Sequence, residues 1–259
     1  MIPSDQPPAE PQLDASAPAA PPPEFPPAPP PGETVPFWNY QDLVMFLAFA
    51  LPSLVIAAFA VQAMPFTRNY GKAFQGLLAQ LIWYILVFGA LYLMLRARYH
   101  RPFWRSLGWQ FPFHGMAITL FGGPLLAFGI GYVGYILRTP EVATPFHQMV
   151  ANRPTLVLFA VFVIAIGPLC EELAFRGFLM PLLIRSFGVA AGILATGALF
   201  GALHAPEYAW SWRHVFLITA AGCAFGYVRY RSGSTAASTF MHSAYNLTQF
   251  AAFLGQGQQ

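Results

Sequence analysis

Seven long stretches of apolar residues, separated by short polar segments, follow one another through the sequence after residue 41. A helix needs about 20 apolar residues to cross the hydrocarbon layer of a membrane, and most of these stretches reach that length. No stretch alternates like a membrane barrel, and an open sheet would leave backbone groups unpaired in lipid. The sequence therefore predicts an all-α polytopic membrane protein, a bundle of about seven transmembrane helices (six to eight). The expected spans are 42–64, 75–95, 115–137, 155–184, 189–205, 213–230 and 235–254.

The composition agrees with a membrane location. Hydrophobic residues make up 56% of the chain and charged residues 9%, whereas soluble domains have about 25% charged residues. The net charge is +3, but the arginines fall mainly in loops, where they determine orientation in the membrane. We therefore expect membrane lipid, and no nucleic acid, as a partner. Cys170 and Cys223 both lie inside apolar stretches and predict neither a disulfide framework nor a CxxC metal site.

The N-terminal segment differs from the rest of the chain. Residues 1–36 hold 14 of the 25 prolines and no Lys or Arg. Such a segment cannot form a core, so we expect a disordered, partly polyproline II tail that acts as a spacer. It lacks the basic start and apolar centre of a signal peptide. Residues 37–259 form the expected integral-membrane helical domain.

The basic residues outside the spans indicate an orientation. With seven spans, seven arginines lie on the same side as the tail and five basic residues lie on the other side. The positive-inside rule then places the N-terminus in the cytoplasm. The basic and aromatic segment RARYHRPFWRSLGW, residues 96–109, is expected to lie on the cytoplasmic membrane surface.

The fourth span contains the charged motif EELAFRG, which begins at Glu171. Ionisable side chains at membrane depth are rare and by default mark a functional site. Glu172 and Arg176 are four residues apart with the acid first, which brings an ion pair together on one helical face. Glu171 lies about 100° around the helix from Glu172 and is free to point elsewhere. Gly167 and Pro168 are expected to kink the span just before the carboxylates.

Two further polar motifs occur in later spans. FGALH ends at His204 in the fifth span, and HSAYN places His242 and Asn246 on one face of the last span. A single buried histidine is usually a hydrogen-bonded core residue. Three polar sets in three spans all need partners in lipid, so we expect the helices to surround one polar intramembrane cavity.

Such a cavity supports two kinds of hydrolysis. In the first, Glu171 acts as the general base on water because it is partly desolvated and has no arginine partner. The imidazoles and the Asn246 amide then orient the water or stabilise an oxyanion. In the second, Glu171, His204 and His242 bind zinc and leave an open position for water. The residues alone leave both mechanisms open.

In this order and on the fourth, fifth and seventh expected membrane helices, EELAFRG, FGALH and HSAYN resemble the motifs of the CPBP family of intramembrane proteases. That family comprises the type II CAAX prenyl endopeptidases and the bacteriocin-processing or immunity-associated (Abi-like) proteins. The resemblance covers about residues 90–254, the expected protease core. It implies an integral protein of a bacterial inner membrane, with a peptide or a lipidated protein as substrate. It also implies that Glu172 and Arg176 brace their helix as a structural ion pair.

The resemblance implies a catalytic role for four side chains. Glu171 is expected to activate the water, with His204 helping to hold it. His242 and Asn246 are expected to stabilise the oxyanion. Members of the family have been described both as metalloproteases and as metal-independent glutamate proteases, so a divalent metal such as zinc stays an alternative.

Two other functions fit the same constellation. One is a non-catalytic membrane scaffold or bacteriocin-immunity protein that binds a peptide in the cavity. The other is a transporter whose intramembrane charges relay protons or ions. The complete motifs favour the endopeptidase over the scaffold. The motifs are not repeated between the two halves of the chain, which argues against the transporter.

Overall fold

The computed structural model describes residues 36–111, 115–142 and 153–256, and all regular elements in these ranges are helices. This confirms the predicted all-α membrane fold. The described residues belong to one compact unit, Val35–Gln259. The predicted tail, apart from Pro36, lies outside the described residues.

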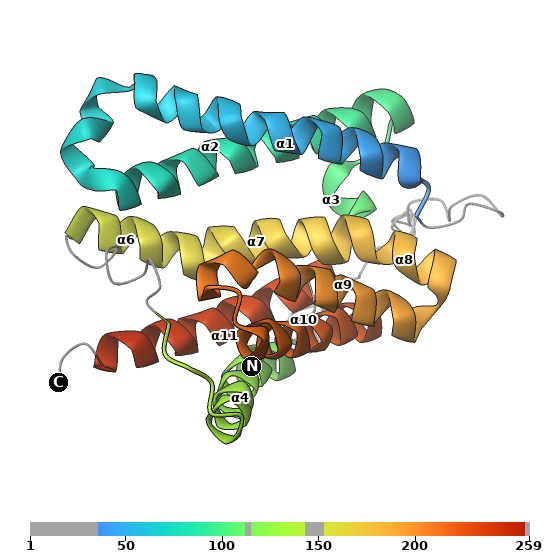
Figure 1. Cartoon of the computed structure of the whole chain (residues 1–259). Helices are drawn as coiled ribbons and strands as arrows, with labels where there is room; N and C mark the ends of the chain where they lie inside the picture. The colour runs from blue at the N-terminus through green and yellow to red at the C-terminus, as the bar shows by residue number, and fades with distance from the viewer. Residues whose placement is uncertain (1–35, 112–114, 143–152, 257–259) are drawn as a thin grey trace, which may run out of the picture. The chain divides into compact units, whose positions relative to one another are not determined.

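The first two long helices form a hairpin (Figure 1). α1 (Tyr40–Ala63) and α2 (Gly71–Leu93) are joined by the 3-10 turn η1 (Pro65–Tyr70) and pack along each other. α1 begins at a capping box, in which the Asn39 side chain accepts from the backbone N–H of Asp42 and the Asp42 carboxylate accepts from that of Asn39. The box satisfies two backbone donors that have no partner inside the helix.

The expected fourth span is one helix of 35 residues from Arg153 to Phe187. A π-helical turn ends at Ile166, just before the expected kink position, and the chain stays helical through Gly167 and Pro168. Prolines and π turns are the usual places where the regular hydrogen-bond ladder of a helix is rearranged. The segments of this helix are α6 (Arg153–Val161), η3 (Phe162–Ile166), α7 (Gly167–Glu172), η4 (Leu173–Leu179) and α8 (Met180–Phe187).

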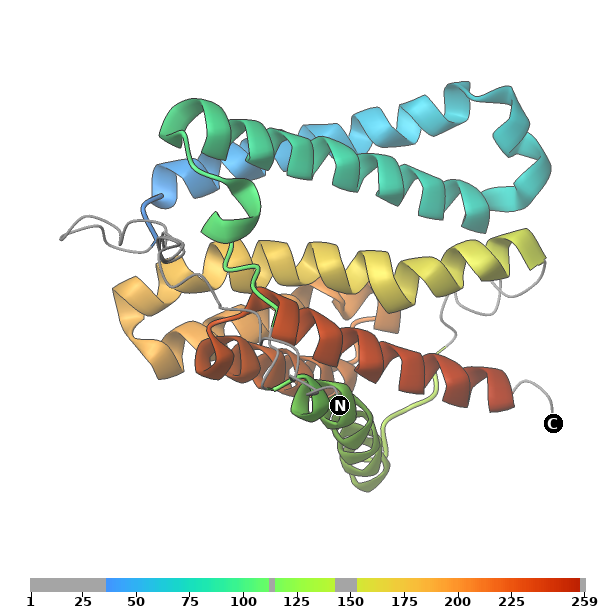
Figure 2. The ribbon, with the colours of Figure 1, turned by 180° about the vertical axis from the view of Figure 1, so that it is seen from behind.

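Four more long helices belong to the described unit: α4 (Met116–Ile136), α9 (Val189–Leu203), α10 (Trp212–Ser232) and α11 (Thr235–Gln256). α9 packs against α8, η4 and α10, and α11 packs against α7, η3, α10 and α4. Figures 1 and 2 show the long helix of α6–α8 between the α1–α2 hairpin and these later helices. The three helices that carry the polar motifs are therefore neighbours in space.

Four helical segments of the described residues are long and apolar enough to cross a membrane: Tyr40–Ala63, Pro65–Arg98, Met116–Ile136 and Arg153–Phe187. α9 is apolar but shorter, with 15 residues. α10 and α11 are long enough, but their residues are more polar, since α10 has arginines near both ends and α11 carries HSAYN. Each of the seven expected stretches is helical in the structure, and four of them meet the criteria of length and apolarity.

The basic segment 96–109 differs in part from its expected place on the membrane surface. It folds into the end of the π turn η2 (Met94–Arg98) and the short helix α3 (Phe103–Ser106). Phe103 and Leu107 are buried in a core cluster, although Trp104 is half exposed. Leu107 packs where Gly177 of η4 has no side chain, so the aromatic and apolar residues of this segment fill the core beside the charged motif.

Glycines allow α9 and α10 to approach closely. A Cβ atom on Gly201 of α9 would lie 2.7 Å from the Val215 carbonyl oxygen and even closer to the Thr219 hydroxyl group of α10. One on Gly197 would collide with Cys223. This close approach holds His204 at the end of α9 near the charged motif.

Alanine in place of Gly201 should therefore separate α9 from α10 and lower the free energy of unfolding by about 1–3 kcal/mol, as overpacking of a filled core does. The measurement is the unfolding transition of the purified protein in detergent. Gly89→Ala in α2 is the matched control, because a Cβ there meets no atom within 4 Å. Equal stability of the two variants would contradict this account of the α9–α10 contact.

Candidate active site

The charged motif forms a fully buried ion pair. Arg176 Nη1 donates to Glu172 Oε1 at 2.9 Å, and neither side chain is exposed. Arg176 Nη2 donates to the Gly222 carbonyl oxygen of α10 at 2.7 Å. A Cβ on Gly222 would lie 3.3 Å from this same nitrogen, so the glycine lets the guanidinium reach the backbone. The ion pair thereby links the central helix to α10.

Aromatic rings surround the guanidinium group. The Arg176 Cζ atom lies 4.7 Å from the ring centroid of Phe200 and 5.6 Å from that of Phe225. Cation–π attraction is strongest where the charge is desolvated, as it is here. Neither Gly222 nor Phe225 carries a polar side chain, so residue type does not mark them as part of a polar site. The small-residue spacing Gly222–Gly226 in α10 is a sequence signal for close helix packing there.

His242 lies between the Glu172–Arg176 ion pair and Glu171, the other carboxylate of the motif. Its Nδ1 atom lies 3.0 Å from Glu172 Oε1, and its ring stacks on Phe225 with centroids 4.4 Å apart. A carboxylate paired with arginine is an acceptor, so Nδ1 carries a proton and donates. Glu172 therefore orients the imidazole and leaves Nε2 as the nitrogen on the side of Glu171.

Glu171 lies on the other side of that imidazole. Its Oε2 atom is 3.8 Å from His242 Nε2, beyond hydrogen-bond distance, and its side chain is 23% exposed whereas that of Glu172 is wholly buried. The carboxylate lies over Gly167, where a Cβ would come within 3.7 Å of Oε1. Glu171 is thus the acid of the motif that water can reach.

His204 contacts the other residues of the site through Phe200, the first residue of FGALH. Its Nδ1 atom lies 2.7 Å from the Phe200 carbonyl oxygen, which can only accept, so Nδ1 carries the proton and Nε2 is the free acceptor. The His204 and His242 rings contact the same Phe200 ring, with centroids 4.5 Å and 5.8 Å away. Within the described residues, no hydrogen bond or ion pair joins His204 to Glu171.

Asn246 of α11 contacts the π-helical turn η3 in the long helix α6–α8. Pro168 has no N–H to offer the carbonyls of the preceding π turn, and the Asn246 Nδ2 atom donates to one of them, Val163 O, at 2.8 Å. This contact docks α11 onto the helix just before the carboxylates. It uses one N–H of the carboxamide and leaves the other N–H and the oxygen available.

Glu207 borders the site from outside the motifs. It lies in η5 (Ala205–Tyr208), three residues after His204, and is exposed. Partial desolvation raises the pKa of its carboxyl group, with the nearby His204 opposing this shift and the Glu171 carboxylate adding to it. Glu207 is therefore within electrostatic reach of two residues of the site.

The described side chains do not converge as a metal site. Across residues 36–111, 115–142 and 153–256, no three His, Cys, Asp or Glu side chains stand close enough to hold one ion. The three expected zinc ligands illustrate why: His242 Nε2 faces Glu171, but the His204 ring contacts Phe200 and reaches neither of them directly. The side chains as they stand do not fit the zinc arrangement.

Comparison with known proteins places the motifs in one family domain. The family model described as type II CAAX prenyl endopeptidase Rce1-like matches residues 153–248. The matched region contains all of EELAFRG, FGALH and HSAYN, which confirms the family resemblance inferred from them. No match was found among curated proteins or among solved structures.

Proposed function

Because residues 153–248 match the type II CAAX prenyl endopeptidases, we propose that this membrane protein is an intramembrane endopeptidase that hydrolyses a peptide bond in or next to the bilayer. The proposed substrate is a peptide or a lipidated protein. The proposed location is a bacterial inner membrane with the N-terminus in the cytoplasm.

The observation that carries the proposal is the different environment of two adjacent carboxylates. Glu172 is wholly buried and bonded to both Arg176 and His242, so it is held as an anion and orients its partners. Glu171 has no arginine partner and is partly exposed. Two acids in contrasting environments can serve different roles, one as a fixed charge and the other as a proton acceptor.

In the proposed mechanism Glu171 takes a proton from a water molecule as that water attacks the scissile carbonyl carbon. The carbonyl oxygen gains negative charge, and His242 Nε2, protonated, together with the free N–H of Asn246 donates hydrogen bonds to it. Glu172 holds the imidazole ring in place by accepting from its Nδ1 atom. Glu171 then gives its proton to the leaving nitrogen as the C–N bond breaks. His204 Nε2 accepts from the water and holds it in place.

The most direct test is a cleavage assay with the purified full chain in lipid nanodiscs. Matched peptides with and without a prenylated cysteine are incubated with the protein, and the products are identified by mass spectrometry. We expect a single new C-terminus and faster cleavage of the prenylated peptide. If neither peptide nor a wider peptide library is cleaved by a folded protein, the endopeptidase proposal fails.

We further propose that the reaction is of the glutamate type and needs no bound metal. Treatment with a strong chelator should therefore leave the rate of peptide cleavage unchanged. The measurement is the initial rate before and after chelation, with the metal content of the purified protein determined in parallel. A loss of activity that added zinc restores would favour the metalloprotease mechanism instead.

A further inference from the structure

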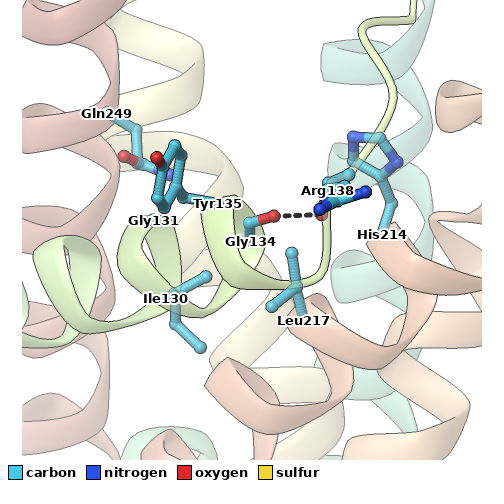
Figure 3. Close-up of a pocket in the computed structure, with 9 residues that line it drawn as sticks. Ile130, Gly131, Gly134, Tyr135, Arg138, His214, Leu217 and Gln249 are labelled. Atoms are coloured by element: carbon cyan, nitrogen blue, oxygen red, sulfur yellow. Dashed lines mark hydrogen bonds between the residues drawn. The ribbon is translucent and has the colours of Figure 1, made fainter.

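A helix outside the three motifs, α2, packs beside the candidate active site. Figure 3 shows a hollow of about 430 Å³ at the end of α4, and the residues drawn there, among them Tyr135, Arg138 and Gln249, lie outside the motifs. α2 instead shares a core cluster with η3 and α7, the segments on either side of the Ile166–Gly167 junction. It reaches them from the opposite side to α11 (Figures 1 and 2). α2 also precedes residues 153–248, so the family match assigns no role to its side chains.

Tyr84 is a polar side chain in this contact between α2 and the central helix. It is 8% exposed, and its ring stacks on that of Phe162 with centroids 5.6 Å apart and planes within 11°. It packs in the same cluster as Cys170, the residue before Glu171. Its hydroxyl group is within electrostatic reach of the Glu171 carboxylate and, more weakly, of Glu207. Tyr84 therefore belongs to the surroundings of the proposed base.

The Tyr84 hydroxyl group has a hydrogen atom left to donate. The Gln80 Nε2 atom lies 3.4 Å from the hydroxyl oxygen and can only donate, so this contact uses the oxygen as an acceptor. Among the described residues, no acceptor receives the Tyr84 O–H itself. Hydrogen bonds to an anion are stronger than those to a neutral acceptor, so the O–H favours a nearby carboxylate.

The two oxygens of Glu171 have different neighbours. Oε2 is 3.8 Å from His242 Nε2. Oε1 lies on the side of Gly167, where a Cβ would be 3.7 Å both from Oε1 and from Cε1 of the Phe162 ring, on which Tyr84 stacks. No direct hydrogen bond joins Tyr84 to Glu171 in the described part of the chain, and a bridging water is nearly as good as a direct bond. We propose that Tyr84 is a positioning residue, whose hydroxyl group holds Glu171 Oε1 through one water molecule and thereby directs Oε2 toward the water that attacks the substrate.

The first test does not depend on the proposed function. An infrared difference spectrum between the full chain and its Glu171→Gln variant, both in lipid nanodiscs, isolates the carboxylate stretching band of Glu171. Tyr84→Phe keeps the ring that stacks on Phe162 and removes the hydroxyl group, so the same difference taken in that background should show a shifted band. Tyr92→Phe is the matched control in α2, because Tyr92 is 47% exposed and its ring contacts Phe103. It should leave the band in place.

The second test is kinetic and rests on the proposed function. Tyr84→Phe should lower kcat for peptide cleavage about tenfold or more, the size of a hydrogen bond to a charged group, and change KM less than about twofold. This pattern is expected because the hydroxyl group acts through Glu171 and not on the bound substrate. In the Glu171→Gln background the same change should lower the residual rate less than about twofold, since no carboxylate is left to position. A purely structural role of Tyr84 would lower the rate equally in both backgrounds.

The proposal is overturned if Tyr84→Phe leaves the carboxylate band in place, or if Tyr92→Phe shifts it as much. A raised KM with an unchanged kcat would place the hydroxyl group on the substrate and also overturn it. If the wild-type protein cleaves no peptide, the proposed function fails, whereas the infrared band still decides the role of Tyr84. Should Tyr84→Phe fail to fold, Gln80→Leu takes its place, because it removes the donor that orients the hydroxyl group. A band that stays in place in that variant overturns the proposal.

Discussion

Glutamine in place of Glu171 is expected to abolish peptide cleavage while the protein remains folded. The change keeps the size and polarity of the side chain but removes the carboxylate that accepts the proton from water. General-base catalysis contributes about 10²–10⁴-fold to rate, so cleavage should fall at least that far. Folding should survive because Glu171 is partly exposed and has no arginine partner. Initial rates of peptide cleavage and the unfolding transition in detergent are the two measurements.

Glu207→Gln is the matched control for this experiment. It removes a carboxylate that lies within electrostatic reach of Glu171 and His204 but is exposed in η5. We expect it to retain most of the cleavage rate. If Glu171→Gln stays fully active, or if Glu207→Gln is inactive while Glu171→Gln is not, the assignment of the water-activating base is wrong.

Much of the fold follows from the sequence because hydrocarbon permits so few structures. A chain with long apolar stretches must satisfy its backbone internally, so helices were predictable wherever such stretches occur. The Glu172–Arg176 spacing likewise predicts a contact within one helix, and Arg176 Nη1 lies 2.9 Å from Glu172 Oε1 in the structure. Local periodicity was sufficient in both cases.

Contacts between different helices could not be predicted from local sequence patterns. Nothing in the spacing of Glu172 and His242 indicates that His242 Nδ1 lies on Glu172 Oε1, because two helices have to dock first. The same holds for Asn246, which the motif suggested as an oxyanion donor and which also bonds the Val163 carbonyl before Pro168. The burial of Phe103 and Leu107 was missed because a basic, aromatic composition does not show which face packs on Gly177.

The shared position of Glu172 explains why the motif has two acids and one arginine. One carboxylate oxygen accepts from both Arg176 and His242, so the pair neutralises charge in the core and also fixes the imidazole. A second carboxylate with the same partners would be held as a fixed anion and could not serve as a base. The proposed division of roles therefore requires that Glu171 does not pair with Arg176, and no ion pair joins the two among the described residues.

Replacing Arg176 by methionine is expected to lower the free energy of unfolding by about 3–5 kcal/mol, the usual cost of breaking a buried ion pair from one side. Methionine restores much of the volume and can contact the surrounding phenyl rings. It cannot neutralise Glu172 or donate to the Gly222 carbonyl, so a buried anion and a backbone acceptor lose their partner. The unfolding transition of the purified protein in detergent measures the loss.

Two variants distinguish this explanation from a simple loss of packing. In the double variant Arg176→Met with Glu172→Gln, no uncompensated charge is buried, so a large part of the lost stability should return. Arg68→Met is the matched control, because Arg68 is exposed and has no ion pair among the described residues, so its replacement should change stability by no more than about 0.5 kcal/mol. If the double variant is no more stable than Arg176→Met, or if Arg68→Met costs as much, burial of an unpaired Glu172 is not the cause. The cleavage rate of the double variant tests whether the charge of Glu172 acts on the reaction through His242. Glutamine at position 172 still offers an oxygen to Nδ1 but carries no negative charge. A rate well below that of the folded wild-type protein would indicate that Glu172 acts on the reaction through the imidazole as well as on stability through Arg176.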